Sequence, residues 1–215
     1  VPFADSMLFK LPPDVDPTEF VASGDNLAVG YASIAPHIKS GSERVLILGS
    51  GINGLYVAAF ARALGLSDVV YVDEDPENLR QAAGLGCASS GTLERDMGPF
   101  DVVVDASCDP KLLRRRVLQV LQPEGVVECV GHMQDITLDG WAWYGRGATF
   151  HCGVCSSSPH VEQVFRYVAA GAVLPSQLWS DLVPFDDDLP RAFVAHRRQL
   201  VAVRPDQQSI HTGLR

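Results

Sequence analysis

The sequence has 215 residues, of which 47% are hydrophobic and 20% are charged, and these are the proportions of a globular protein. Its formal net charge is −9 at pH 7, which is the wrong sign for binding a phosphate backbone, so we expect no nucleic-acid partner. No apolar run reaches the roughly 18 residues that span a bilayer, and no signal peptide is recognisable. We therefore expect a cytoplasmic protein without a membrane partner.

The first 40 residues are expected to hold two short helices without a core of their own. A proline-rich opening over residues 11–17 precedes helical patterns over residues 18–23 and 27–34. We expect both helices to dock onto another part of the protein.

An apolar run that ends in three glycines comes next. Residues 45–48 are too uniformly apolar for a half-exposed strand and indicate a buried parallel strand. The glycines have the spacing G-x-G-x-x-G, in which the first allows a tight turn, the second lets the backbone approach a pyrophosphate, and the third lets the next helix pack on the strand. Amides at the start of that helix would bind the phosphates. The expected cofactor-binding residues of this turn are Gly49, Gly51, Ile52, Asn53 and Gly54.

A helix over residues 55–64 and a second buried strand over residues 68–73 follow the glycines. The second strand ends in Asp73, and 73 − 51 = 22 residues separate it from the second glycine. This is close to the roughly 20 residues expected for a carboxylate that binds an adenosine ribose. A carboxylate there would repel a 2′-phosphate, which favours NAD over NADP as the cofactor.

Two alternatives remain open for these features. Asp73 could instead cap the helix that begins near residue 75, where proline and acid stand in the first turn. A methyltransferase is the main rival for the glycine turn, although its glycine loop usually follows an acid near the end of the first strand.

The remaining alternation of strands and helices predicts an α/β fold with a Rossmann-type, doubly wound parallel sheet. A third strand near residues 87–90 is only weakly indicated, without a convincing crossover helix after it. Aromatic residues in a glycine-flanked loop, 140–145, are expected either to pack beneath the domain, which we favour, or to form part of an interface. Further elements are expected at residues 100–106 (strand), 111–121 (helix), 122–125 (turn), 125–131 (strand), 148–155 (strand), 160–170 (helix), 189–196 (helix) and 199–203 (strand), with a disordered tail from residue 206.

Five cysteines occur without the spacing of a disulfide framework and suggest reduced thiols: Cys87, Cys108, Cys129, Cys152 and Cys155. The last two have the C-x-x-C spacing of a redox pair or of half a zinc site. No second pair accompanies them, and strand residues at i and i+3 point to opposite faces. We interpret these two cysteines as strand packing.

In its order of features the sequence resembles the zinc-type alcohol dehydrogenases of the medium-chain dehydrogenase/reductase superfamily. The matching stretches are residues 4–12, 23–31, the glycine motif, Asp73, and residues 103–107, 123–131, 182–193 and 199–205. The catalytic domain with which such proteins begin has no counterpart here. The resemblance implies docking helices over residues 1–40, a dinucleotide-binding domain over 41–175, and a C-terminal segment over 176–215 that returns to the catalytic domain.

The resemblance also implies roles for single residues. Asp25 occupies the place of an acid that can ligate the catalytic zinc, although it could instead be a helix N-cap. Val130, Gly131 and His132 would meet the nicotinamide ring.

The sequence departs from the family at three positions. Asn78 and Gln199 stand where cations are common near the cofactor, and Cys108 replaces a common glycine. Losing two cations should weaken cofactor binding.

The expected function is that of the NAD-binding portion of a zinc-type alcohol or polyol dehydrogenase, which transfers hydride between nicotinamide and an alcohol or carbonyl substrate. Zinc would be bound only in an intact protein, and the chain alone should be inactive. The alternative is a non-catalytic nucleotide-binding or scaffold module. Because the family's nucleotide domains commonly dimerise through an edge strand, we also expect a homodimer that pairs the strand at residues 148–154.

Overall fold

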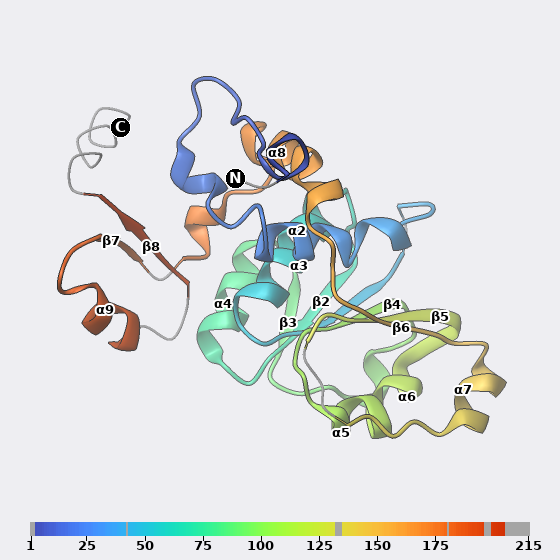
Figure 1. The fold of residues 1–215 in the computed structure, drawn as a ribbon. Helices are drawn as coiled ribbons and strands as arrows, with labels where there is room; N and C mark the ends of the chain where they lie inside the picture. Colours follow the sequence, from blue (N-terminus) through green and yellow to red (C-terminus); the bar gives the residue numbers. More distant parts are fainter. Residues whose placement is uncertain (1–2, 42, 132–134, 180, 196–198, 205–215) are drawn as a thin grey trace.

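A six-stranded, wholly parallel sheet forms the centre of the molecule (Figure 1). The computed structural model describes residues 3–41, 43–131, 135–179, 181–195 and 199–204. The sheet has the order β3-β2-β1-β4-β5-β6, which is the doubly wound Rossmann arrangement. Its strands are β1 (Val45–Leu48), β2 (Val69–Val72), β3 (Ala88–Ser90), β4 (Phe100–Asp105), β5 (Leu121–Cys129) and β6 (Thr149–Cys152). The expected fold class is therefore confirmed.

Both faces of the sheet are covered, because successive residues of the buried strands point to opposite sides. Val45 and Ile47 belong to one core, whereas Leu46 and Leu48 belong to the other. The first core is covered by α2 (Asn26–Ala32), α3 (Ile52–Ala63), α4 (Pro76–Gly84) and α8 (Val161–Ala169). The second is covered by α5 (Pro110–Leu112), a π-helical turn (Leu113–Val117), α6 (Leu118–Val120) and α7 (Gly140–Arg146). This accounts for the uniformly apolar strands.

The helices expected within residues 1–40 do dock onto the nucleotide-binding fold. Leu27 and Ile34 are fully buried in the first core, beside α3. A side chain at Gly30 would come within 2.7 Å of Cβ of Tyr56, so glycine is required where α2 crosses α3. The short elements here are α1 (Ala4–Met7) and the 3-10 turns η1 (Pro17–Phe20) and η2 (Ala35–His37).

A small second sheet lies to one side of the main one (Figure 1). It pairs β7 (Asp181–Pro184) with β8 (Leu200–Val203), and α9 (Leu189–Ala195) connects these strands. Gln199 anchors this lobe, since its side-chain oxygen accepts a hydrogen bond of 2.9 Å from the hydroxyl of Tyr56 on α3. Further 3-10 turns are η3 (Arg95–Met97), η5 (Ser158–His160) and η6 (Pro175–Gln177).

Two local expectations are wrong. The aromatic loop at residues 140–145 is the helix α7, which Asp139 caps by accepting bonds from two backbone amides and which ends at Gly147 in the left-handed region. The turn at residues 122–125 lies within β5, where the strand bulges between the pairs Phe100–Leu121 and Val102–Val126.

Other expectations are met more closely. The weakly indicated third strand exists as β3 at the sheet edge, and only the turn η3 stands in its crossover to β4. The helix expected at residues 111–121 is helical from Pro110 to Val120 with a π turn inside it. The expected tail from residue 206 lies outside the described residues. No helix in the described part of the chain is long and apolar enough to cross a membrane.

Candidate functional site

The glycine turn joins β1 to α3 at the carboxyl edge of the sheet, next to the point where the strand order reverses. A side chain at Gly49 would collide with the hydroxyl of Tyr71, and one at Gly54 would come within 3.0 Å of Cα of Gly49. Gly51 has a φ of +69°, in the left-handed region that favours glycine. All three glycines are therefore required by the backbone geometry.

The first turn of α3 presents backbone amides without a side-chain cap, because Gly51 is its N-cap residue. These amides have no partners within the helix, and they carry its positive dipole end. Such a helix start binds phosphate well. Asn53 lines a pocket here, whereas Ile52 packs partly against the first core.

Asp73 follows β2 and is held by three hydrogen bonds. Its Oδ2 accepts from the Tyr71 hydroxyl at 3.1 Å and from Nδ2 of Asn78 at 2.9 Å. Its Oδ1 accepts from the amide of Asp75 at 2.9 Å. The N-cap of α4 is Asp75, whose carboxylate accepts from the Glu77 amide. Asp73 is thus not the cap of that helix, and its half-buried carboxylate is fixed at the edge of the sheet.

A pocket of about 660 Å³ extends from the glycine turn to Asp73. The loop from Gly91 to Glu94 forms another wall. Among the described residues that line the pocket, the charged side chains are Asp73, Glu74, Asp75, Glu94, Asp109 and Arg116. Five carboxylates against one guanidinium make the pocket strongly electronegative.

A second pocket, of about 690 Å³, lies beyond the end of β5. It brings together four of the expected site residues: Asp25, Asn53, Val130 and Gly131. His132, which was expected to lie beside them, is outside the described residues. Ile52 and Gly54 line neither pocket, and the other expected site residues within the described part of the chain divide between two pockets, one beside the glycine turn and Asp73 and one beyond the end of β5.

The three residues that differ from the family pattern have distinct surroundings. Asn78 is buried and donates to Asp73, while its own side-chain oxygen has no hydrogen-bond partner among the described residues. Cys108 has a φ of +58°, in the left-handed region that favours glycine. A side chain at Gly131 would collide with Sγ of Cys108. Gln199 is bonded to Tyr56, as described above.

Asp25 holds the N-cap position of α2, but its side chain makes no capping hydrogen bond. The carboxylate is exposed and lines the second pocket. A catalytic zinc needs about three protein ligands. The part of the chain that the structure describes contains no group of three or more His, Cys, Asp or Glu residues able to hold a metal. The described residues therefore do not form a zinc site by themselves.

The sequence analysis missed a buried carboxylate in the second pocket. Glu128 is only 7% exposed, and its Oε2 lies 3.0 Å from Nε2 of His37. Nδ1 of His151 lies 2.7 Å from the same carboxylate. A charged residue between the buried residues Val127 and Cys129 of the strand was the available signal. The histidines are 91 and 23 residues away in sequence, so the sequence offered no sign of the contact.

A second missed acid is Asp105, the fully buried last residue of β4. Burial raises its pKa, and the Ser107 hydroxyl and amide partly offset this by donating to Oδ1 at 2.6 and 2.9 Å. Its Oδ2 has no hydrogen-bond partner among the described residues. The sequence signal was an acid that closes a buried strand, as Asp73 does.

Comparison with known proteins gives a consistent result. A zinc-type alcohol dehydrogenase-like protein of Schizosaccharomyces pombe is 35% identical over 230 residues, covering 90% of this chain and 53% of the relative. Alcohol dehydrogenase TADH from Thermus sp. ATN1 superposes with a TM-score of 0.84 at 25% identity, over 94% of this chain and 65% of that enzyme. No protein-family model matches the chain.

Structures with bound cofactor share the fold at lower identity. An alcohol dehydrogenase of E. coli CFT073, described as a complex with NADH, has a TM-score of 0.78 at 15% identity over 90% of this chain and 60% of that one. A zinc-binding dehydrogenase of Sinorhizobium meliloti 1021, described as bound to NADP, has a TM-score of 0.77 at 17% identity over 91% of this chain and 62% of that one. At such identities these matches support the fold alone.

The strand order and the glycine turn define a Rossmann-type fold, the architecture on which dinucleotide sites are built. The two similarities above relate the chain to the zinc-type alcohol dehydrogenases of the medium-chain dehydrogenase/reductase superfamily, to which it is similar over at least 90% of its own length. It corresponds to their nucleotide-binding and C-terminal portion, and it spans about half the length of the S. pombe relative.

Proposed function

We propose that this chain binds NAD as the nucleotide-binding portion of a zinc-type alcohol or polyol dehydrogenase. The observation that carries the proposal is the fixed carboxylate of Asp73, which shares one pocket with Gly49 and Gly51. Bound NAD would supply hydride transfer between its nicotinamide and the carbon of an alcohol or carbonyl substrate.

The chain's own residues would bind and orient the cofactor. The uncapped amides at the start of α3 would donate to the pyrophosphate. Asp73 would accept hydrogen bonds from the adenosine ribose, while Tyr71 and Asn78 keep its carboxylate in place. The backbone of Val130 and Gly131 would face the nicotinamide half in the second pocket.

The electrostatics of the first pocket favour NAD over NADP in this proposal. A 2′-phosphate would lie close to Asp73 and would add charge to a pocket in which five carboxylates face one arginine. Unit charges about 4 Å apart interact by roughly 1 to 4 kcal/mol between water and a protein surface. A penalty of this size is enough for at least several-fold discrimination against NADP.

Catalysis would need groups beyond the described residues. Asp25 is available as one zinc ligand, but one carboxylate does not hold a catalytic zinc. We therefore propose that the chain alone does not turn over substrate. The substrate class of alcohols and carbonyl compounds follows from the family and not from the pockets.

A non-catalytic nucleotide-binding module is the second candidate function. The observation that favours it is the loss of two cations, since Asn78 is committed to Asp73 and Gln199 to Tyr56. This candidate expects weak or absent NAD binding by a stable fold. A methyltransferase is disfavoured, because the similarities reported above are to dehydrogenases.

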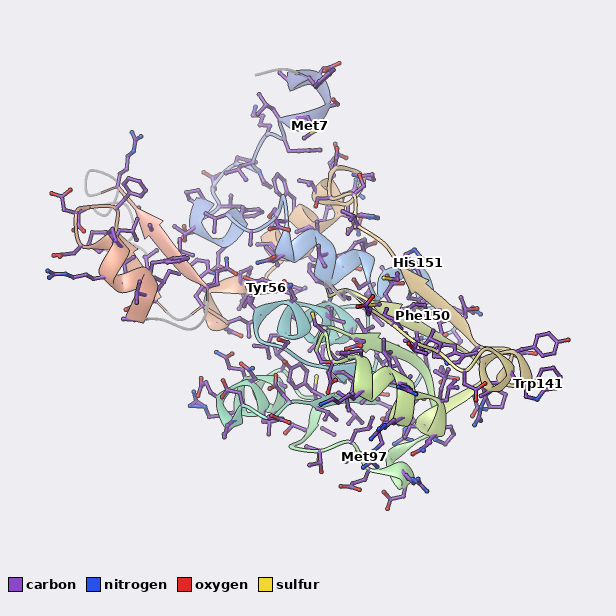
Figure 2. All side chains as sticks on the ribbon, turned by 60° about the horizontal axis from the view of Figure 1, so that its bottom comes forward. Met7, Tyr56, Met97, Trp141, Phe150 and His151 are labelled. Carbon is purple, nitrogen blue, oxygen red and sulfur yellow. The ribbon has the colours of Figure 1, made fainter. Side chains whose placement is uncertain are left out.

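We also propose a cytoplasmic homodimer that pairs the edge strand β6 with its twofold mate. The strand lies at the end of the sheet order, and an open edge is a template for such pairing. Next to it on α7, the stacked rings of Trp141 and Tyr144 are 81% and 77% exposed, whereas Trp143 is buried. Figure 2 shows Trp141 at the outer end of the molecule. A monomeric mass by light scattering would count against the dimer.

The cofactor proposal is tested by calorimetric titration of the chain with NAD, NADP and S-adenosylmethionine. Saturable binding of NAD, with weaker binding of NADP and none of S-adenosylmethionine, is the expected result. Preferential binding of S-adenosylmethionine would contradict the NAD proposal and favour the methyltransferase alternative. An absence of binding by a chain with a cooperative unfolding transition would favour the structural module.

A further inference from the structure

Two cysteines that are far apart in the sequence lie side by side in the sheet. Cys129 ends β5 and Cys152 ends β6, and the two are register partners in this parallel pair. Neighbouring strands are about 4.8 Å apart. Disulfides join Cα atoms that are about 4.4 to 6.8 Å apart, so the register places these two residues at a compatible separation.

The two thiols also face one another. Residues that are paired in a parallel sheet point to the same face, and both cysteines line the second pocket. Burial, followed by the proximity of Cys152 and Asp105, raises the pKa of Cys129 to about 12. Cys129 also lies 3.7 Å from the carbonyl oxygen of Gly131.

Their accessibility differs in a way that assigns each a role. Cys152 is exposed on the edge strand, whereas Cys129 is only 2% exposed beneath it. A dissolved reagent reaches the exposed sulfur first, and the buried sulfur is next to it to complete an exchange. Cys155, the other cysteine of the C-x-x-C spacing, lies beyond the end of β6, where burial and then the charges of Glu128 and Asp25 raise its pKa.

We propose that Cys129 and Cys152 are a reversible disulfide site, oxidised by low-molecular-weight disulfides of the glutathione type. The Cys152 thiolate attacks one sulfur of the reagent, forms a mixed disulfide and releases one thiolate. Cys129, as it loses its proton, attacks the Cys152 sulfur and releases the second. The two protein thiols are oxidised, the reagent is reduced to two thiols, and the two protons from the cysteines end on the released thiolates.

The disulfide would form in the lining of the second pocket, to which both cysteines belong. Cys129 is followed by Val130 and Gly131, which line that pocket. A covalent link there would fix the edge strand to β5 at the place where the proposed nicotinamide half binds. The disulfide site itself rests on sheet register and exposure and does not depend on the proposed cofactor.

The test is oxidation of the 215-residue chain by glutathione disulfide, followed by thiol counting in denaturant and peptide mass mapping. The expected result is the loss of two thiols and a single linked peptide pair that contains Cys129 and Cys152. Reduction with dithiothreitol should restore both thiols. A bond from Cys152 to Cys155, a bond from Cys129 to another cysteine, a persistent glutathione adduct, or no reaction would each overturn the proposal.

Substitutions at each of three cysteines sharpen the result. Cys155→Ser should form the same bond at the same rate as the unmodified chain. Cys152→Ser should lose the reaction at Cys129, because the exposed sulfur is absent. Cys129→Ser should stop at a glutathione adduct on Cys152, and Cys129→Ala gives the same measurement if the serine variant does not fold. Loss of two thiols to an internal disulfide in either variant that lacks Cys129 or Cys152 would contradict the assignment.

Discussion

The hydroxyl of Tyr71 donates to Oδ2 of Asp73 at 3.1 Å and also occupies the space where a side chain at Gly49 would lie. One buried ring on β2 thus connects the glycine turn to the acid that is proposed to bind ribose. The pocket depends on this contact, because it fixes the carboxylate relative to the phosphate-binding amides.

Tyr71→Phe should weaken NAD binding by a few-fold, because Asp73 loses one of the donors that orient it. Loss of one hydrogen bond in a buried position should lower the free energy of unfolding by about 1 kcal/mol. Calorimetry with NAD and with nicotinamide mononucleotide, which lacks the adenosine ribose, measures the effect. Binding of the mononucleotide should not change, and Tyr144→Phe, in an exposed ring, should leave NAD binding and stability unchanged. Equal weakening of the binding of NAD and of the mononucleotide would contradict a role of Tyr71 in holding Asp73.

Gly49→Ala should abolish NAD binding and lower the free energy of unfolding by about 1 to 3 kcal/mol, as overpacking does. The methyl group would meet both the Tyr71 ring and, at 2.8 Å, Oδ2 of Asp73. The matched control is Gly84→Ala at the end of α4, where a side chain meets nothing within 4 Å. Urea unfolding and NAD titration of both variants provide the measurement. If Gly49→Ala unfolds and binds like the control, the turn is not as tight as described.

Cys108→Gly should stabilise the chain by roughly 0.5 to 1 kcal/mol. A non-glycine residue in the left-handed region costs about 1 to 2 kcal/mol, and the greater freedom of glycine in the unfolded chain offsets part of that gain. Thermal unfolding should show a higher midpoint for this variant than for Cys108→Ala, which keeps the backbone strain. A lower midpoint for glycine than for alanine would show that the strain is absent.

Glu43→Gln should destabilise the chain by about 1 to 2 kcal/mol at neutral pH, with a smaller effect in acid. Burial alone would raise the pKa of Glu43, but donation by the backbone amides of Ser40 and Lys39 outweighs it and lowers the pKa to about 2. A depressed carboxyl pKa stabilises the fold above the ordinary value of 4.5, and this contribution is lost as the pH falls towards 2. Urea unfolding should show that the difference in the free energy of unfolding between the unmodified chain and Glu43→Gln is smaller at pH 3 than at pH 7. The control Glu162→Gln, at an exposed position, should show no such pH-dependent difference. A difference that stays constant with pH would contradict the shifted pKa.

The sequence was most informative where the determinants are local. Uniformly apolar strands and the glycine spacing are short patterns, so β1, β2 and the turn between them were predicted correctly. The doubly wound order then followed from alternation of strands and helices. The number of residues between Gly51 and Asp73 was also enough to predict that both lie at the same edge of the sheet, because one helix and one strand of ordinary length connect them.

Features that depend on tertiary contacts could not be predicted in the same way. Helix α7 has glycine and aromatic residues of modest helix propensity, and burial of Trp143 against Phe150 together with the Asp139 cap decides its conformation. The bonds of Glu128 to His37 and His151 depend on the register of β5 with β6 and on the docking of η2. The C-x-x-C spacing of Cys152 and Cys155 was interpreted as strand packing, and nothing in the sequence indicated that strand register pairs Cys152 with Cys129.

The most direct test of the central claim is the preference between NAD and NADP in Asp73→Asn. The amide keeps the size of the carboxylate but removes its charge and one pair of acceptor sites. We expect NAD binding to weaken about tenfold, a loss of roughly 1.4 kcal/mol, and the discrimination against NADP to disappear. The control Glu162→Gln removes an exposed charge on α8 and should bind both cofactors like the unmodified chain. If Asp73→Asn kept the NAD affinity and the NAD-over-NADP ratio of the unmodified chain, Asp73 would not be the ribose-binding acid.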